Sequence, residues 1–96
     1  MIIQLLDELS DTLKVHQLWS NTPPNTAAFA STAPFCYDTM RFEQWLQFVF
    51  IIKMKQLIAA NQPLPKGANI TPMAEQMLGD YPKVIDVIKK IDKALN

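Results

Sequence analysis

The segment from Asp38 to Ala60 constrains this chain most, because it is apolar on nearly every side. As a helix, it would fill two seams with large side chains. One seam consists of Phe42, Trp45, Leu46, Val49 and Ile52, and the other of Phe50, Met54, Leu57 and Ile58. A helix that is hydrophobic all round must be surrounded by other elements. A strand is the competing interpretation, but no second strand candidate exists to pair with it. We therefore expect an all-α domain around a nearly fully buried central helix.

Apolar residues at spacings of three and four predict one helix before this segment and another at the end of the chain. The first spans residues 2–19, with His16 at the edge of the core and Trp19 at the helix end. Its apolar stripe consists of Ile2, Leu5, Leu6, Leu9 and Leu13. The last helix follows Asp80 as its N-cap, and we place Asp92 on its polar face. Its apolar face consists of Val84, Ile85, Val87, Ile88, Ile91 and Leu95.

Capping residues mark the remaining boundaries. Asp38 or Thr39 is expected to cap the central helix, because both are good N-cap residues. Thr71 followed by Pro72 predicts the start of a short helix over residues 72–78, which Gly79 would end in the left-handed conformation. The connections 20–37 and 61–70 are long but carry apolar side chains, so we expect them to pack on the helices. We also expect the first connection to contain a turn of helix at residues 27–30. The result is one four-helix, bundle-like domain over residues 1–96 with long ordered loops.

Composition excludes several classes of function. The net charge is zero, although residues 1–40 carry −3 and residues 41–96 carry +3, an imbalance too small for a nucleic-acid footprint by itself. One His and one Cys, His16 and Cys36, do not make a zinc site or a disulfide. Two Gly leave no phosphate-binding loop. We expect no cofactor, no metal and no catalytic residues. We also expect no membrane span and a cytoplasmic location.

Several motifs of the chain resemble those of one known family. They are Pro34-Phe35-Cys36-Tyr37-Asp38-Thr39-Met40, then Trp45-Leu46-Gln47, then Gln62-Pro63-Leu64-Pro65, then Ile70-Thr71-Pro72-Met73. Together they are similar to the YqcC-like family of small bacterial proteins of unknown function. The resemblance covers nearly the whole chain and implies an all-α, four-helix fold. It also implies a link to tRNA modification, because family members are similar to proteins encoded beside a tRNA pseudouridine synthase.

The strongest candidate site is a groove beside the central helix. The extended segments Pro34–Tyr37 and Pro63–Pro65 would flank opposite ends of this helix, with methionine and aromatic side chains between them. Such side chains favour adaptable binding of an apolar peptide or helix. The predicted groove consists of Phe35, Asp38, Met40, Trp45, Lys53, Met54, Pro63, Leu64 and Pro65. The alternative is that Phe35, Met40, Trp45 and Met54 are ordinary core residues.

Three hypotheses about function follow. The preferred one is a protein-interaction or accessory module, with a tRNA pseudouridine synthase as the partner that the resemblance implies. The second is a weak tRNA-binding protein that uses Arg41, Lys53, Lys55, Lys66 and the lysines of the last helix. The third is an enzyme or a small apolar-ligand carrier with an interhelical pocket. A homodimer through exposed Met and Phe side chains is a further alternative.

Overall fold

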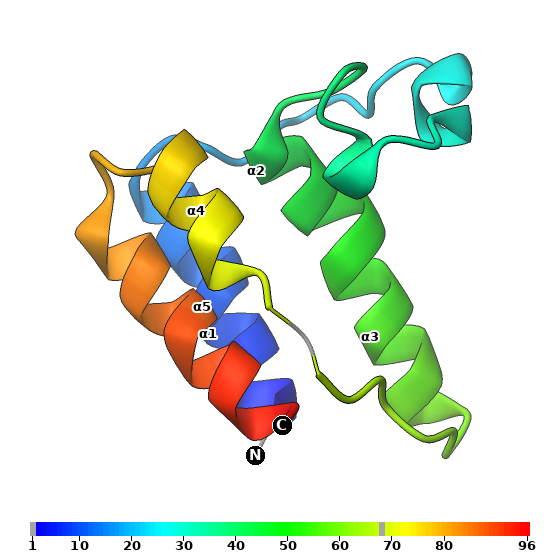
Figure 1. Ribbon diagram of the computed structural model, residues 1–96, viewed down its shortest axis with the longest axis vertical. Helices are drawn as coiled ribbons and strands as arrows, with labels where there is room; N and C mark the ends of the chain where they lie inside the picture. The colour runs from blue at the N-terminus through cyan, green and yellow to red at the C-terminus, as the bar shows by residue number, and fades with distance from the viewer. Residues whose placement is uncertain (1, 68) are drawn as a thin grey trace.

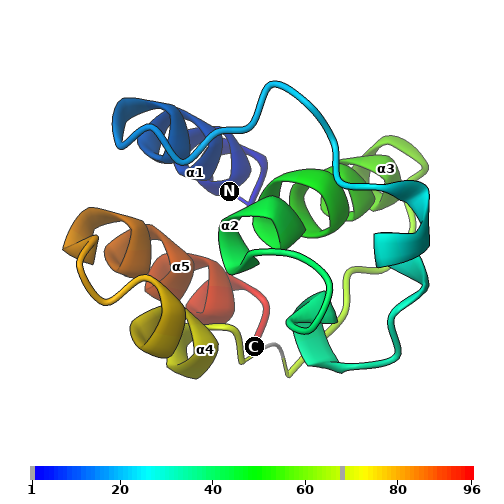
Figure 2. The same ribbon diagram turned by 90° about the horizontal axis from the view of Figure 1, so that it is seen from above.

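A computed structural model describes residues 2–67 and 69–96; Met1 and Ala68, the latter in the second predicted connection, lie outside the described residues. The fold is all-α, as predicted, and the described residues include no β-strand. The helices α1 (Ile2–Val15) and α5 (Pro82–Ala94) lie side by side, and α4 (Thr71–Met77) packs on α5. The central helix lies on the other side of the molecule, joined to α1 and α4 by the two long connections (Figure 1 and Figure 2).

The central helix is continuous but contains one wide turn. It is formed by α2 (Phe42–Trp45), the π-helical turn η3 (Leu46–Phe50) and α3 (Ile51–Ala59). In η3 the Ile51 N–H donates to the Leu46 carbonyl, five residues back instead of four. The extra residue keeps Phe42, Leu46, Ile51 and Met54 buried along the helix. Turns of this kind are frequent at functional sites.

The central helix is less enclosed than the sequence predicted. Ile52 is 45% exposed, Lys53 is exposed, and Val49 is half-buried. The core is shared by α1, α4, α5 and the buried side of the central helix. Small domains bury a smaller fraction of their surface than large ones. In a chain of this length the other helices are too few and too short to surround the central helix. One side of the central helix is therefore left to the loops.

Left-handed residues set the C-terminal ends of α1 and α3. Gln17 has φ +60°, and the Leu18 N–H donates to the Leu13 carbonyl at 2.8 Å. This is the Schellman arrangement, which satisfies carbonyls at a helix end. The predicted helix over residues 2–19 is therefore too long, and Trp19 lies in the following loop. The same arrangement ends α3 at the predicted place, where Asn61 has φ +54°.

The first long connection is held to the central helix by one side chain. Gln47 is buried, its Oε1 accepts from the Ser20 N–H at 2.8 Å, and its Nε2 donates to the Ser20 carbonyl at 2.8 Å. The connection then forms the short 3-10 helices η1 (Thr26–Ala30), as expected, and η2 (Pro34–Cys36). Its predicted packing is wrong for Phe29 and Tyr37, which are exposed.

The predicted cap of the central helix is also wrong. Asp38 accepts a hydrogen bond from the Ser31 hydroxyl at 2.5 Å, and the Thr39 hydroxyl donates to the Ala28 carbonyl at 2.8 Å. Both side chains therefore hold the loop together. The helix begins at Phe42, and Arg41 is its N-cap residue, with its N–H donating to the Gln44 side chain at 3.0 Å.

A buried carboxylate joins α5 to the start of α4. Asp92, predicted on the polar face, is only 9% exposed. Its oxygens accept from the Ile70 N–H at 2.9 and 3.0 Å, the Thr71 N–H at 2.8 Å and the Thr71 hydroxyl at 2.6 Å. Asp92 therefore satisfies the free N–H groups at the helix start from outside the helix. The role of N-cap predicted for Thr71 is wrong, because α4 already includes it.

Two further boundary predictions around α5 need correction. The N-cap of α5 is Tyr81 and not Asp80, and the helix begins at Pro82, since the helical region is unfavourable for a residue before proline and proline is favoured at the first helical position. Gly79 does not have a left-handed backbone. A Cβ atom at Gly79 would lie 2.9 Å from the Glu75 carbonyl oxygen, so this position needs glycine because of close packing.

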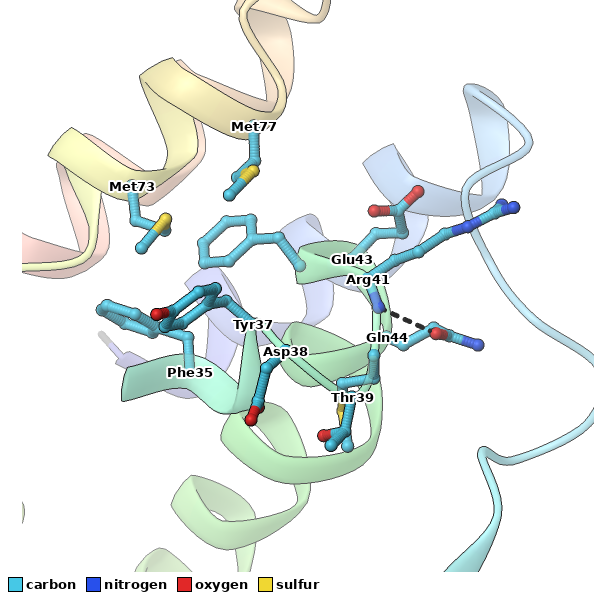
Figure 3. A pocket seen from close by; sticks show the side chains of 11 residues that line it. Phe35, Tyr37, Asp38, Thr39, Arg41, Glu43, Gln44, Met73 and Met77 are labelled. Carbon is cyan, nitrogen blue, oxygen red and sulfur yellow. Dashed lines mark hydrogen bonds between the residues drawn. The ribbon is translucent and has the colours of Figure 1, made fainter. Parts of the chain in front are cut away.

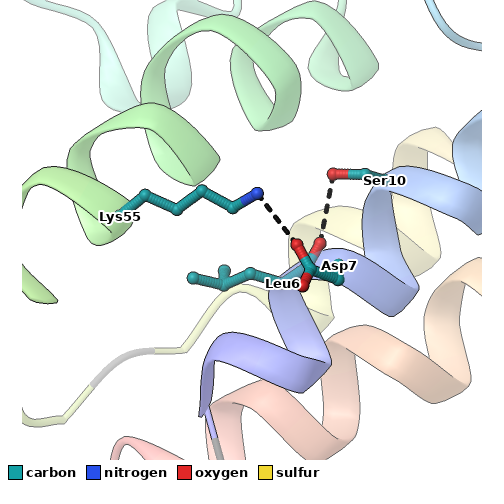
Figure 4. Close-up of polar contacts among 4 residues, drawn as sticks. All are labelled: Leu6, Asp7, Ser10 and Lys55. Atoms are coloured by element: carbon teal, nitrogen blue, oxygen red, sulfur yellow. Dashed lines mark hydrogen bonds and ion pairs between the residues drawn. The ribbon is translucent and has the colours of Figure 1, made fainter. Parts of the chain in front are cut away.

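Polar contacts between α1 and α3 are at the surface (Figure 4). Lys55 Nζ lies 2.9 Å from Asp7 Oδ1, and the two side chains are 43% and 61% exposed. Such an ion pair contributes little to stability. In the same figure the buried Ser10 hydroxyl donates to the Leu6 carbonyl of its own helix at 3.1 Å. Over the described residues, no helix is long and apolar enough to cross a bilayer.

Candidate functional site

The open side of the central helix forms a groove of about 540 Å³, which we call the α3 groove. Its floor comes from α2, η3 and α3, and its two walls from η2 and from the second long connection. It is lined by Phe35, Trp45, Val49, Phe50, Lys53, Met54, Leu57, Pro63, Leu64, Pro65, Asn69 and Ile70. Most of the residues predicted to form a groove therefore line one depression, the exceptions being Asp38 and Met40.

Asp38 and Met40 line a second depression of about 540 Å³, which we call the Met pocket (Figure 3). Phe35 and Tyr37 face Met73 and Met77 of α4 across this pocket. Its remaining lining residues are Thr39, Arg41, Phe42, Glu43 and Gln44. Phe35 belongs to both depressions and separates them. The predicted site is thus divided in two by one aromatic ring.

The end of the α3 groove near η2 is made of packed aromatic rings. The ring centroids of Phe35 and Trp45 are 4.8 Å apart at 82°, and those of Trp45 and Phe50 are 5.6 Å apart at 24°. Phe42 lies behind them, 5.8 Å from Phe35. Edge-to-face and offset-stacked rings stabilise one another beyond their buried area. Trp45 nevertheless remains half-buried, so part of its ring is available at the surface.

The backbone that carries Phe35 is strained. Phe35 and Cys36 have φ +58° and +50°, which is unfavourable for residues with a Cβ atom. Each such residue costs about 1–3 kcal/mol and persists only where the surroundings enforce it. Here the Cys36 carbonyl accepts from the N–H groups of Thr39 and Met40 at 3.0 Å each. The turn therefore fixes the direction of Phe35 at the boundary between the two depressions.

Lys53 is the one charged side chain among the residues that line the α3 groove. It is exposed, and the ion pairs of the described residues involve Lys55 and Lys90 instead. No acidic side chain lines the groove. The groove therefore combines an apolar surface with one unneutralised positive charge.

The opposite wall of the groove has free backbone groups. In the segment Pro63–Pro65, Leu64 provides the sole N–H, because proline has none. No hydrogen bond involves the backbone of Leu64 in the described structure. Its side chain packs against the core, and the adjoining Ile70 is held by Asp92. The wall is thus anchored at both Leu64 and Ile70, while the N–H and carbonyl of Leu64 have no hydrogen-bond partner among the described residues.

Sequence reasoning missed two residues that position this site, Gln47 and Asp92. A signal for Asp92 existed, because it follows Ile88 by four residues and Ile85 by seven, which places it on the apolar stripe of α5. Gln47 gave no such signal, since its burial depends on the π-helical turn. His16, predicted at the core edge, is half-buried against Tyr81 at 5.6 Å between ring centroids. Cys36 is also half-buried.

Comparisons with known proteins agree on one family. A family model named DUF446 and described as "tRNA pseudouridine synthase C" matches residues 1–94. An uncharacterized protein of Haemophilus influenzae is 38% identical over 78 residues, covering 81% of this chain and 74% of that protein. The uncharacterized protein YqcC of Escherichia coli is 37% identical over 89 residues, covering 92% and 82%. The solution NMR structure of YqcC matches with a TM-score of 0.82 at 35% identity, covering 96% of this chain and 82% of that one.

A third relative is much longer than this chain. The tRNA pseudouridine synthase C of Pectobacterium carotovorum is 40% identical over 64 residues. These residues cover 67% of this chain but 17% of that protein. A segment similar to this chain is therefore a minor part of that polypeptide.

Proposed function

Because the chain belongs to the DUF446 family, whose members include YqcC, we propose that it is a protein-interaction module that assists a tRNA pseudouridine synthase. The observation that carries the proposal is the α3 groove, an apolar depression along the central helix. Depressions lined by aromatic and methionine side chains suit the binding of a partner's apolar segment.

The synthase is proposed as partner because of the third relative. In that protein a segment similar to this chain shares a polypeptide with about five times as many other residues, under the name of a synthase. Two functions joined in one chain have a high effective concentration for each other. A separate chain of the same family would need an interface that replaces this covalent connection. The α3 groove supplies such a surface.

Binding to tRNA itself has less support. Of the lysines considered for this role, Lys55 pairs with Asp7 at 2.9 Å, and Lys90 lies 3.6 Å from Glu8. Arg41 lines the Met pocket together with acidic side chains, away from the α3 groove. These contacts divide and partly neutralise the positive charges, whereas phosphate binding depends on a concentrated basic surface.

The test is a titration of the purified chain against the tRNA pseudouridine synthase C of the same organism, with and without tRNA. Val49→Asp places a charge in the groove, at a half-buried position outside the core cluster. Val15→Asp is the matched control, because Val15 is 76% exposed on α1. We expect binding without tRNA, a loss of at least about tenfold for Val49→Asp, and no change for Val15→Asp. Absence of binding, or equal effects of both variants, would contradict the proposal.

A further inference from the structure

We infer that the α3 groove binds an extended segment of its partner in which an apolar residue and an acidic residue are two positions apart. This rests on the proposed function and adds the chemistry of the bound segment. Three features of the groove carry it: the aromatic and aliphatic floor, the backbone of Leu64, which has no hydrogen-bond partner among the described residues, and the charge of Lys53.

The backbone of Leu64 favours an extended occupant over a helix. A residue before proline favours extended conformations, and Leu64 lies in the connection between α3 and α4, so it resembles one residue of a strand edge. An extended residue presents its N–H and carbonyl to the same side and can exchange both hydrogen bonds with one residue of a neighbouring strand. A helix satisfies its own backbone and would leave these groups unpaired. Addition of a strand to exposed backbone groups is a common mode of peptide recognition.

The distance between Val49 on the floor and the charged Lys53 matches the distance between alternate side chains of an extended segment. Val49 and Lys53 both line the groove and are one helical turn apart, about 6 Å along the helix. In an extended segment, side chains two residues apart point to the same side and are about 6.6 Å apart. An apolar side chain over Val49 would therefore place the next side chain on that face near Lys53.

The charge of Lys53 selects an acidic group at that position. No carboxylate lines the groove, and the described residues give Lys53 no ion-pair partner. Lys66 follows the wall and is likewise exposed, so it adds a second positive charge next to the wall. A single phosphate would satisfy the same charge, but the surrounding floor is apolar and favours a protein segment over RNA. An acidic residue next to an apolar one satisfies the floor and the charge together.

The first experiment compares four variants of the whole chain for binding to the intact synthase. Lys53→Glu reverses the groove charge, and Lys89→Glu is its control on the exposed face of α5. Leu64→Pro removes the free N–H, and Leu64→Ala is its control, because it shortens the side chain but keeps the N–H. We expect Lys53→Glu to weaken binding at least tenfold, and Leu64→Pro to bind several-fold more weakly than Leu64→Ala, with circular dichroism confirming that each variant is folded.

The second experiment locates the bound segment with overlapping peptides of the synthase. The peptide that competes with intact synthase should contain an apolar residue and, two positions before or after it, Asp or Glu. Replacing that acid by Lys should abolish binding to the wild-type chain and restore it to Lys53→Glu.

The outcomes separate the two proposals. If the synthase does not bind at all, the proposed function fails and this inference with it. If it binds but Lys53→Glu and Leu64→Pro behave as their controls do, the inference alone fails. It also fails if Lys53→Glu weakens only the binding that requires tRNA, because Lys53 would then contact phosphate.

Discussion

Replacing Asp92 by alanine should be the most destabilising polar substitution in this chain. The Asp92 carboxylate is 9% exposed and accepts hydrogen bonds from three donor groups of Ile70 and Thr71 at 2.6–3.0 Å. Ile70 is itself only 4% exposed, so water cannot readily take the place of the lost acceptor. The substitution would therefore leave a buried N–H group without a partner.

The expected cost follows from these contacts. A buried donor left unsatisfied costs about 1–3 kcal/mol. Loss of the acceptor for a second N–H at the start of α4 resembles the loss of an N-cap, about 0.5–2 kcal/mol. The Thr71 hydroxyl can turn toward water and adds little. The sum is about 3 kcal/mol, a large share of the roughly 5–14 kcal/mol expected for a domain of this size.

Urea unfolding followed by circular dichroism would measure this change. With a slope of about 1.5 kcal/mol per molar urea, 3 kcal/mol lowers the midpoint by about 2 M. Asp92→Asn should cost about half as much, because one carbonyl oxygen remains but its amide group faces another donor. Asp86→Ala is the control, since Asp86 is exposed on the same helix and should change stability by less than about 0.5 kcal/mol. If Asp92→Ala were no more destabilising than Asp86→Ala, the assignment of Asp92 as the external cap of α4 would be refuted.

Three other substitutions test how the helix ends and loops are held. Gln17→Gly should raise the free energy of unfolding by about 1 kcal/mol, because glycine adopts φ +60° without the penalty of a Cβ atom. Asn61→Gly should raise it by less, since Asn tolerates this conformation. Thermal melts that rank the two variants in the reverse order would contradict the argument. Gln47→Ala should lower the free energy of unfolding by about 1–2 kcal/mol, because it removes both hydrogen bonds to Ser20. Hydrogen exchange at the Ser20 amide should accelerate more than exchange at amides within α1. Unchanged exchange at the Ser20 amide would show that other contacts hold the loop.

Much of the fold was predictable because it depends on helical periodicity. The α5 stripe from Val84 to Leu95 is buried at every predicted position. The all-α class followed from the same pattern. The errors occur where the burial or backbone conformation of one residue depends on its tertiary contacts and not on the sequence pattern. Asp92 was assigned to the solvent by its charge, although its position lies on the buried stripe, and Gly79 was interpreted as a left-handed cap when close packing against Glu75 explains it.

Helix lengths were harder to predict for a related reason. The end of α1 depends on Gln17 in a left-handed conformation, which amino-acid preference would assign to glycine or asparagine. At Asn61 the preference and the structure agree, and the end of α3 was correctly predicted. The π-helical turn at Leu46–Phe50 could not be predicted, because the apolar residues there are nearly continuous and satisfy several helical registers equally well.

The candidate site was partly predictable because prolines restrict the backbone around it. Pro34 and the Pro63–Pro65 segment mark extended or irregular chain, and the central helix between them is too apolar to face water unaided. This placed Phe35, Trp45 and the Pro63–Pro65 segment together. The division of the site by Phe35 could not be predicted, since it depends on two consecutive left-handed residues that sequence preferences disfavour.

Both walls of the α3 groove are fixed by contacts within the chain, without a bound partner. On one wall, the strained turn at Phe35 and Cys36 persists because backbone hydrogen bonds and neighbouring rings enforce it. On the other wall, Ile70 is fixed by the Asp92 carboxylate from α5. Fixing both walls before binding lowers the conformational entropy that a partner must pay to order the site. Asp92→Asn, if the chain stays folded, should therefore also weaken binding. If it weakens binding more than Val49→Asp does, the wall at Ile70 sets the affinity, rather than the apolar floor.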